Sequence, residues 1–444
     1  MNTIKETLIN LRASLWFVPG LMIVFSIALA LVLIEVDSSV KLKWLVDYPR
    51  IFGLGADGSR GMLTAIASSM LTVAALAFSL TLAAVTQASG QFTPRIFRNF
   101  MRDRANQFIL GYFVSIFAYC LIVLRTIRGA DEVKFVPSLA VLCGLVLAIG
   151  GVLVLIFFIH HIADSLQITT ILNNITDETK QAVRRMYPQE MGDEAVEGEQ
   201  NATWLSKDVK SWRTIPAREA GYVQDVDIDG LLEFAAANRI LIQMRRGVGQ
   251  FAGRGATIAE IAPEVETPNR EPEIGRKKSE QINGFFTIDR HRPIEKDVGF
   301  GIRQIVDIAL KALSPGVNDT TTAINCIDNL GEIVAEIARR LMPAKLRSKD
   351  NVPRVITLAP DFQEYVETAF DQIRISGKAN FAIFERLLTT VSFVAECTGD
   401  DSRRRVLCRQ IELIGEFADQ TLETDYEKER VRTRSAEAGL TFSK

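Results

Sequence analysis

An apolar segment over residues 62–88 constrains this chain more than any other feature, because small and hydroxyl residues recur along one side of it. Steps of three, four or seven residues separate them, which places all six within about 40° of one line along an α-helix. They are Thr64, Ser68, Thr72, Ala75, Ser79 and Thr86. A helix surrounded only by lipid gains nothing from such a stripe. We therefore expect the stripe to meet another helix, a polar cavity or a pore.

Four segments are apolar over the length of roughly 20 residues that a helix needs to cross a bilayer, or close to it. The predicted spans are residues 15–34, 62–85, 108–124 and 137–159, and charged residues flank each of them. The rest of the 444-residue chain is polar and charged. The sequence thus predicts a mainly α membrane protein, with a tail at 1–14, a four-span membrane domain at 15–164 and a cytosolic α+β region after it.

An even number of spans places both termini on the same side of the membrane. The Lys and Arg counts in the short loops favour the cytosol for that side by a small margin. Five scattered cysteines without a CxxC pair indicate reduced thiols, which fits the cytosol as well. We therefore expect a multi-pass protein of the bacterial inner membrane with both termini in the cytosol.

The link between the second and third spans, residues 87–107, combines spaced apolar residues with a basic stripe of Arg95, Arg98 and Arg102. This pattern predicts a short amphipathic helix at the level of the lipid headgroups. One interpretation is anchoring to lipid phosphates. The other is a ring of arginines that concentrates anions at the cytosolic mouth of a pore.

Two adjacent histidines, His160 and His161, follow the fourth span. We expect their rings to lie among the lipid headgroups. A role in proton transfer or metal binding needs a partner carboxylate, and Asp164 is four residues from His160.

The polar part of the chain divides into several predicted segments. They are a stalk and flexible linker at 165–215, a small β-module with a linker at 216–290, a helical cytosolic domain at 291–430 and a frayed tail at 431–444. Helices are expected at 300–313, 321–341, 361–376, 380–398 and 402–426. Glycines between 247 and 255 do not match a dinucleotide-binding fingerprint, so we expect them to serve turns.

A break between two of these helices carries a distinctive run of turn residues. It contains Ser314, Pro315, Gly316, Asn318 and Asp319. The Pro-Gly pair ends one helix, and Asn318 or Asp319 is suited to cap the next. The alternative is a ligand-binding or intersubunit role for the same loop.

Several stretches carry a resemblance to a known family. They include the run around Phe78 to Gln107, the segment Phe158-Ile-His-His-Ile-Ala-Asp164 and the segment from Phe300 to Asp319. Together they resemble predicted bacterial membrane proteins that share the domain of unknown function 2254. The resemblance implies four membrane spans and a cytosolic domain but no particular activity. The family usually has Pro after the Asn-Asp pair, where this chain has Thr320.

Composition and motifs narrow the class of function. A net charge of −2 argues against a dedicated nucleic-acid binder, and three histidines argue against a His-rich metal site, so we expect no metal and no cofactor. No nucleophile elbow, phosphate loop or paired-carboxylate motif occurs in the sequence, and we expect no enzyme. The favoured function is a homo-oligomeric membrane protein that forms an ion channel with a cytosolic regulatory domain. The alternative is a membrane-anchored scaffold or ligand sensor, and the ion or ligand is not identified.

Overall fold

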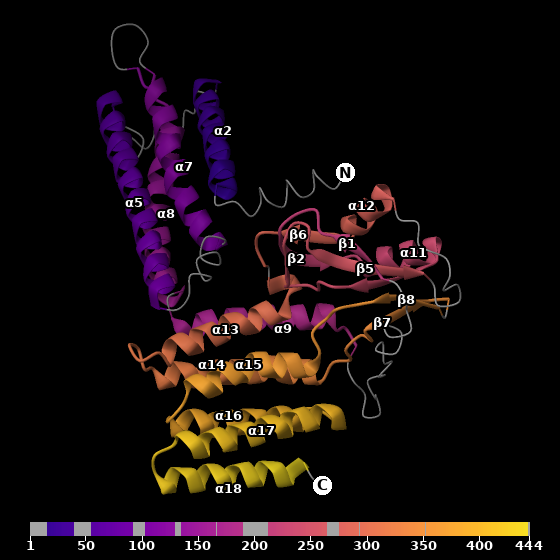
Figure 1. Ribbon diagram of the computed structural model, residues 1–444. Coiled ribbons are helices and arrows are strands. Elements are labelled where there is room, and N and C mark those ends of the chain that lie inside the picture. Colours follow the sequence, from indigo (N-terminus) through magenta and orange to yellow (C-terminus); the bar gives the residue numbers. More distant parts are fainter. Residues whose placement is uncertain are drawn as a thin grey trace. The chain divides into compact units, whose positions relative to one another are not determined.

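The computed structural model forms two compact units, which meet in the sequence between residues 170 and 171 (Figure 1). It describes residues 16–39, 55–91, 103–128, 135–165, 167–189, 212–263, 275–292, 294–350 and 352–442. The first unit contains four apolar helices: α2 (Phe17–Ser39), α5 (Ala56–Gln91), α7 (Arg104–Thr126) and α8 (Ser138–Ser165). Each has at least 23 residues, which is enough to cross a membrane. The prediction of a mainly helical chain with four candidate spans is confirmed.

The observed helices are longer than the predicted spans. The helix α5, for example, includes Asp57 and Arg60 before its apolar stretch begins. Hydropathy detects the apolar stretch that fits the hydrocarbon, whereas the backbone continues its helical hydrogen bonding into the polar flanks.

The helix α7 lies at the centre of the first unit and contacts each of the other three helices. Half of its apolar stretch is buried, against 33% for α5 and 17% for α2 and for α8. Its Phe113, Ile116 and Tyr119 are fully enclosed and join Leu63 of α5 in the core. The outer helices therefore have one face against α7 and another that faces away from the unit.

Polar side chains tie these helices together near their ends. The Asp37 carboxylate of α2 accepts hydrogen bonds from the N–H groups of Leu139 and Ala140, where α8 begins. The Tyr119 hydroxyl donates to the Ala140 carbonyl at 2.7 Å. At the start of α5, Arg60 donates to the carbonyl of Ile127, just after α7, at 2.8 Å. The bonds of Asp37 and Arg60 satisfy helix-end groups that have no partner within their own helix, and the Tyr119 bond adds a further link between α7 and α8.

The second unit contains a five-stranded sheet in the order β1-β5-β3-β8-β7. Its strands are β1 (Arg213–Pro216), β5 (Thr257–Pro263), β3 (Ile240–Met244), β8 (Val352–Ile356) and β7 (Leu346–Lys349). Neighbours are antiparallel except β3 and β8. The expected β-module at 216–290 is therefore incomplete, because two of its strands come from residues 346–356. Strand pairing between distant segments leaves no signal in the local pattern of either one.

A three-stranded sheet, β4-β2-β6, accompanies the larger one. It consists of β4 (Phe251–Ala252), β2 (Gly221–Val226) and β6 (Phe286–Asp289), and the helices α11 (Ile228–Asn238) and α12 (Arg276–Gly284) belong to the same region. The glycines expected in turns include Gly249 and Gly255, whose φ angles are 84° and 83°. Only glycine adopts this backbone conformation without strain.

The remaining helices of the second unit lie in successive layers, from α9 and α13 to α18 (Figure 1). They are α9 (Ile168–Met186), α13 (Val298–Ala312), α14 (Thr320–Ala338), α15 (Phe362–Ser376), α16 (Phe381–Glu396), α17 (Asp401–Thr421) and α18 (Asp425–Phe442). Four helices occur where they were predicted. The fifth, expected at 402–426, ends at Thr421, and the segment expected to fray from residue 431 is the helix α18, which buries Val431. Its few apolar residues are too widely spaced to predict a packed helix from sequence.

The expected stalk at 165–215 needs correction, because α9 belongs to the packed second unit. Three of its side chains reach α14 one helical turn apart: Thr176 bonds Asn329 at 2.8 Å, Lys180 pairs with Glu332 at 2.9 Å and Arg184 pairs with Glu336 at 3.0 Å. On another face α9 approaches α13 so closely that a Cβ at Gly301 would clash with Thr179. The linker residues 190–211 lie outside the described residues.

A buried arginine ends α14 and fixes α17 against it. Arg403 is 1% exposed, and its guanidinium donates to the carbonyls of Ile337, Ala338 and Arg340 at 2.9–3.0 Å. Its guanidinium carbon also lies 5.1 Å from the centre of the Phe362 ring. The last carbonyls of a helix have no partner within it, so a buried cation at this point replaces the missing donors.

Candidate functional site

The hydroxyl stripe of α5 faces away from the other helices of its unit. All six stripe residues are exposed: Thr64, Ser68, Thr72, Ala75, Ser79 and Thr86. The opposite side of α5 packs inward, and there Leu63, Ala67 and Ala74 are at most 4% exposed. Among the described residues of one chain, the stripe therefore lines neither a cavity nor a helix contact within the unit.

The hydroxyls of the stripe differ in how they are satisfied. Thr72 and Thr86 donate to the carbonyls of Ser68 and Leu82, four residues earlier in the same helix, at 2.8 Å. The structure gives no such bond for Ser68 or Ser79 among the residues it describes. A hydroxyl without a hydrogen bond is costly in hydrocarbon.

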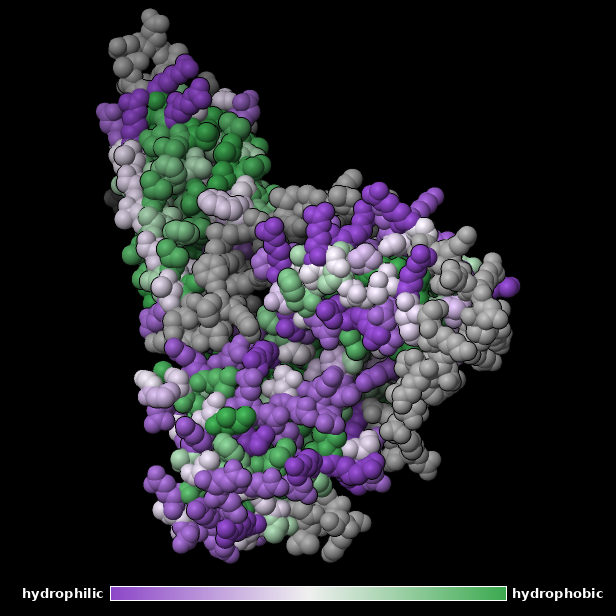
Figure 2. Space-filling view, viewed as in Figure 1, coloured by the Kyte–Doolittle hydropathy of each residue, from purple (hydrophilic) through white to green (hydrophobic). Residues whose placement is uncertain are grey.

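The outward faces of α2 and α8 differ from that of α5. They expose large apolar residues, among them Leu21, Phe25, Val152, Leu153 and Ile156. In Figure 2 the four-helix unit is largely hydrophobic, and paler residues follow the side on which Figure 1 places α5. The composition of α2 and α8 suits lipid acyl chains. The helix α5 also exposes large apolar residues, among them Leu71, Leu76 and Phe78, and differs from α2 and α8 by the hydroxyl stripe between them.

The end of the first unit at which α7 begins carries two pairs of histidine and carboxylate. The His161 Nε2 lies 2.5 Å from the Asp103 carboxylate, whose other oxygen caps α7 by accepting the N–H of Ala105. His160 lies 3.2 Å from Asp164. Sequence reasoning identified Asp164 as a partner and missed Asp103, because α7 and α8 are brought together only by the fold.

The three arginines of the expected amphipathic helix, Arg95, Arg98 and Arg102, lie outside the described residues. Within the described part of the chain, no group of three or more His, Cys, Asp or Glu side chains comes together in a way that would hold a metal ion.

The turn between α13 and α14 brings its predicted residues together in a compact loop. The N–H groups of Val317 and Asn318 bond the Ser314 carbonyl at 3.0 and 2.9 Å, and the N–H of Asp319 bonds the Ala312 carbonyl at 2.8 Å. Asn318 takes the left-handed conformation, with a φ of 48°. Asn tolerates this conformation better than most residues. The polar backbone of the loop is thus largely satisfied from within, and Pro315 and Gly316 are exposed.

Asp319 caps α14, and Thr320 connects this turn to α16. The carboxylate accepts the N–H of Thr322 at 3.0 Å and its hydroxyl at 2.6 Å. Both bonds hold the pKa of Asp319 below its ordinary value, and the bond from the Thr322 hydroxyl contributes most. The Thr320 hydroxyl, at the position where the family usually has Pro, accepts a hydrogen bond from Asn380 at 2.9 Å. Asn380 in turn caps α16, so the threonine joins two helix starts.

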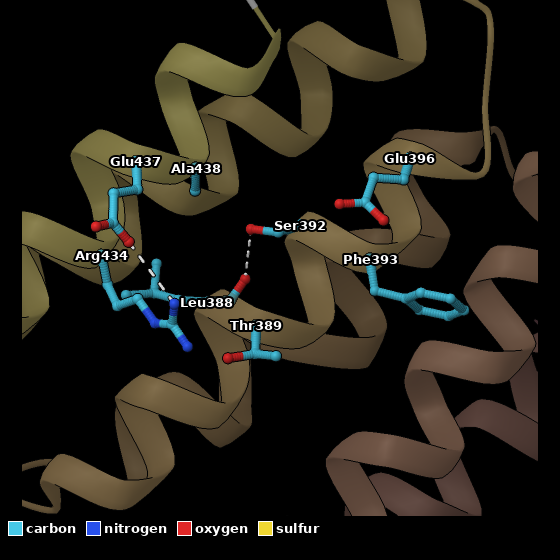
Figure 3. A pocket seen from close by; sticks show the side chains of 8 residues that line it. All are labelled: Leu388, Thr389, Ser392, Phe393, Glu396, Arg434, Glu437 and Ala438. Carbon is cyan, nitrogen blue, oxygen red and sulfur yellow. Dashed lines mark hydrogen bonds and ion pairs between the residues drawn. The ribbon is translucent and has the colours of Figure 1, made fainter.

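A groove between α16 and α18 is a further candidate, and sequence reasoning gave no sign of it. Its volume is about 390 Å³. The lining residues are Leu388, Thr389, Ser392, Phe393, Glu396, Arg434, Glu437 and Ala438. Figure 3 shows Phe393 and Glu396 extending from α16, with Arg434 and Glu437 paired at 3.6 Å on α18. The helix α18 was expected to fray, so a groove beside it could not be anticipated.

The fold defines the class first: a membrane protein with four candidate spans and a second, α+β unit. The chain belongs to the family described as "Predicted membrane protein (DUF2254)", which matches residues 12–392. The resemblance found in the sequence is thereby confirmed. The helices α17 and α18 lie beyond the matched part.

Relatives with similar sequences extend the comparison to nearly the whole chain. An uncharacterised protein of Mycobacterium tuberculosis (strain CDC 1551) is 32% identical over 430 residues, which is 95% of this chain and 80% of the relative. Uncharacterised proteins of Mycobacterium bovis and of M. tuberculosis strain H37Rv are each 31% identical over the same share of both chains. No solved structure matches. The relatives establish the family and assign no activity.

The Asp319 cap leads to a prediction about pH. Because the folded-state pKa of Asp319 is lowered, the cap stabilises the fold above the unfolded pKa of about 3.9 and loses its effect as the pH falls through the folded value. Asp319→Ala should cost about 1 kcal/mol at pH 7. The thermal unfolding temperature of the detergent-solubilised protein should fall at pH 7, and the deficit should shrink toward acid. An equal deficit at both extremes would contradict a charged cap, and Asp177→Ala, at an exposed position inside α9, is the control.

Proposed function

We propose that identical copies of this chain assemble through the outward face of α5 and that the assembly conducts ions along that face. The observation that carries the proposal is the contrast between the outer helices. The outward side of α5 carries a stripe of exposed hydroxyls beside apolar residues such as Leu71 and Phe78, while the apolar stretches of α2 and α8 expose large apolar residues and no hydroxyl. The proposed role is not enzymatic.

Assembly is supported by the chemistry of the stripe. Small residues let two helix backbones approach closely, and hydroxyls without partners gain hydrogen bonds across such a contact. Within the bilayer, the occupant of a helix face is lipid or another spanning helix. All copies of the chain insert in the membrane with the same orientation, so a second copy can make this contact. Identical subunits usually assemble with closed symmetry.

Conduction is supported by the length and polarity of the same face. From Thr64 to Thr86 the stripe covers 22 steps of the helix, or about 33 Å at 1.5 Å per residue, which matches the hydrocarbon thickness. Hydroxyl oxygens along this length can replace part of the hydration of an ion. The apolar part of α5 contains no charged residue, so it presents no fixed charge to a passing ion.

A second candidate is a membrane-anchored ligand sensor that does not conduct. The groove between α16 and α18 favours it, because its volume lies in the range of small-molecule sites and it combines an aromatic ring with carboxylates. In that case the α5 face would serve only to pack copies together.

Cross-linking tests the assembly. In a background with Cys143, Cys397 and Cys408 replaced by Ser, the variant Ser68→Cys should form a disulfide-linked dimer in membranes upon oxidation. Equivalent positions of the stripe come together directly in a twofold contact and face one another across a narrow axis in a ring. The matched control is Val152→Cys, on the outward face of α8, which should stay monomeric. If Val152→Cys forms dimers and Ser68→Cys does not, the contact lies on α8 and the α5 interface is refuted.

Planar-bilayer recording tests conduction. The purified protein should give ion currents, and Ser68→Leu, Thr72→Leu and Ser79→Leu should each reduce the single-channel conductance, because a larger apolar side chain narrows and dehydrates the pathway. Leu153→Ala, on the lipid-facing side of α8, is the control. If the unmodified protein gives no current, conduction is refuted and the non-conducting ligand sensor is the favoured function.

The proposed localisation is the bacterial inner membrane with both termini in the cytosol. A green fluorescent protein fused after Lys444 folds and fluoresces only in the cytosol, so the fusion should be fluorescent in membranes of intact cells. An alkaline phosphatase fused at the same point should be inactive. The reverse pattern would place the second unit outside the cytosol.

A further inference from the structure

Five cations gather at one corner of the sheet region in the second unit, and we call this surface the basic patch. Its residues are Arg218, Arg254, Arg276, Lys277 and Lys278. They come from three segments: the turn after β1, the turn between β4 and β5, and the first turn of α12. Figure 2 shows hydrophilic side chains projecting where Figure 1 places α12 and β1.

Backbone and side-chain bonds hold the three segments together. The Ala217 N–H donates to the Ala256 carbonyl, and the Gly255 N–H donates back to the Ala217 carbonyl, both at 2.8 Å. On the other side, Asn283 of α12 donates to the Pro216 carbonyl at 3.1 Å and accepts the N–H of Arg218 at 3.1 Å. The cations are therefore fixed beside one another by the fold.

The basic patch is only partly neutralised. Its own segments contribute two carboxylates, Glu219 and Glu280, and Glu280 is shared between Arg276 at 3.3 Å and Arg218 at 3.8 Å. Arg254 and Lys277, both exposed, form no ion pair within the described residues.

Several exposed arginines on the last two helices of the second unit are matched by carboxylates. Arg409 pairs with Glu412, Arg432 with Asp419 and Arg434 with Glu437. The corner formed by β1 and α12 differs from these pairs, because there Arg218 and Arg276 share one carboxylate, that of Glu280.

An exposed aromatic residue lies next to the basic patch. Phe251 in β4, three residues before Arg254, is 56% exposed. Its ring packs edge-on against Tyr222, with the ring centres 5.4 Å apart. Exposed aromatic rings beside Lys and Arg are typical of surfaces that lie among lipid headgroups.

We propose that the basic patch, with Phe251 beside it, docks on a bilayer surface that contains anionic phospholipids. Such a surface attracts clustered Lys and Arg within about one Debye length. The chain carries four candidate spans, so its second unit is tethered beside a bilayer at high effective concentration. Nucleic acid, the other polyanion that binds such clusters, has no comparable tether. The proposal goes beyond the proposed function and does not depend on it.

Chemical footprinting of the full chain in nanodiscs tests the docking. Acetylation of Lys277 by a water-soluble ester should be about threefold slower, or more, when phosphatidylglycerol is added to phosphatidylcholine discs, because the patch is then covered. High salt should remove this protection. Acetylation of Lys378, an exposed lysine in the turn before α16, should be the same in both discs.

A charge-reversed variant provides the matched control. Arg254→Glu with Arg276→Glu should abolish the protection of Lys277, and Lys311→Glu with Arg405→Glu, the same charge change on exposed helix residues, should preserve it. Equal acetylation rates of wild-type Lys277 in both kinds of disc would overturn the proposal. This measurement uses the wild-type protein only, so it does not depend on whether a variant folds. Equal protection by inorganic phosphate or by RNA in phosphatidylcholine discs would overturn it too, in favour of a free-anion or nucleic-acid site.

Discussion

The burial of α7 by its three neighbours is the interaction on which the membrane unit depends. Its fully enclosed Phe113 and Tyr119 supply the core, and the Tyr119 hydroxyl anchors α8 through the Ala140 carbonyl. Because α7 occupies the centre, each outer helix keeps a face that the unit itself does not cover. The chemistry of those faces then decides what each one meets in the bilayer, and only α5 offers hydroxyls along its length.

The sequence predicted the spans well and the direction of the stripe only in part. Runs of apolar residues are a direct consequence of membrane thickness, so their positions follow from hydropathy. The helix α5, however, carries two stripes of small residues on roughly opposite faces. Ala67, Ala74 and Ala77 belong to the buried one, and the hydroxyl stripe to the other. Periodicity detects both stripes, and only packing against α7 selects the alanines for the interior.

The remaining differences have the same physical origin, contacts between residues far apart in the sequence. The pairing of β3 with β8, the ladder from α9 to α14 and the Asp103–His161 pair all join distant segments. Local signals served well where the interaction itself is local. A cap of α14 at Asn318 or Asp319 was predicted from neighbouring residues, because a cap needs nothing beyond its own first turn, and the structure has Asp319 as the cap.

The number of copies links the two roles considered for the α5 face. In a twofold assembly each stripe packs directly against its own copy, and Ser68 and Ser79 find partners across the contact without leaving a lumen. In a ring of more copies, each α5 contacts its neighbours at the flanks, and the stripe faces the axis, where water satisfies the same hydroxyls. The same residues therefore serve a closed anchor in one case and a hydrated pathway in the other. Under the proposed function, the symmetry of the assembly, more than any single side chain, would determine whether ions can pass.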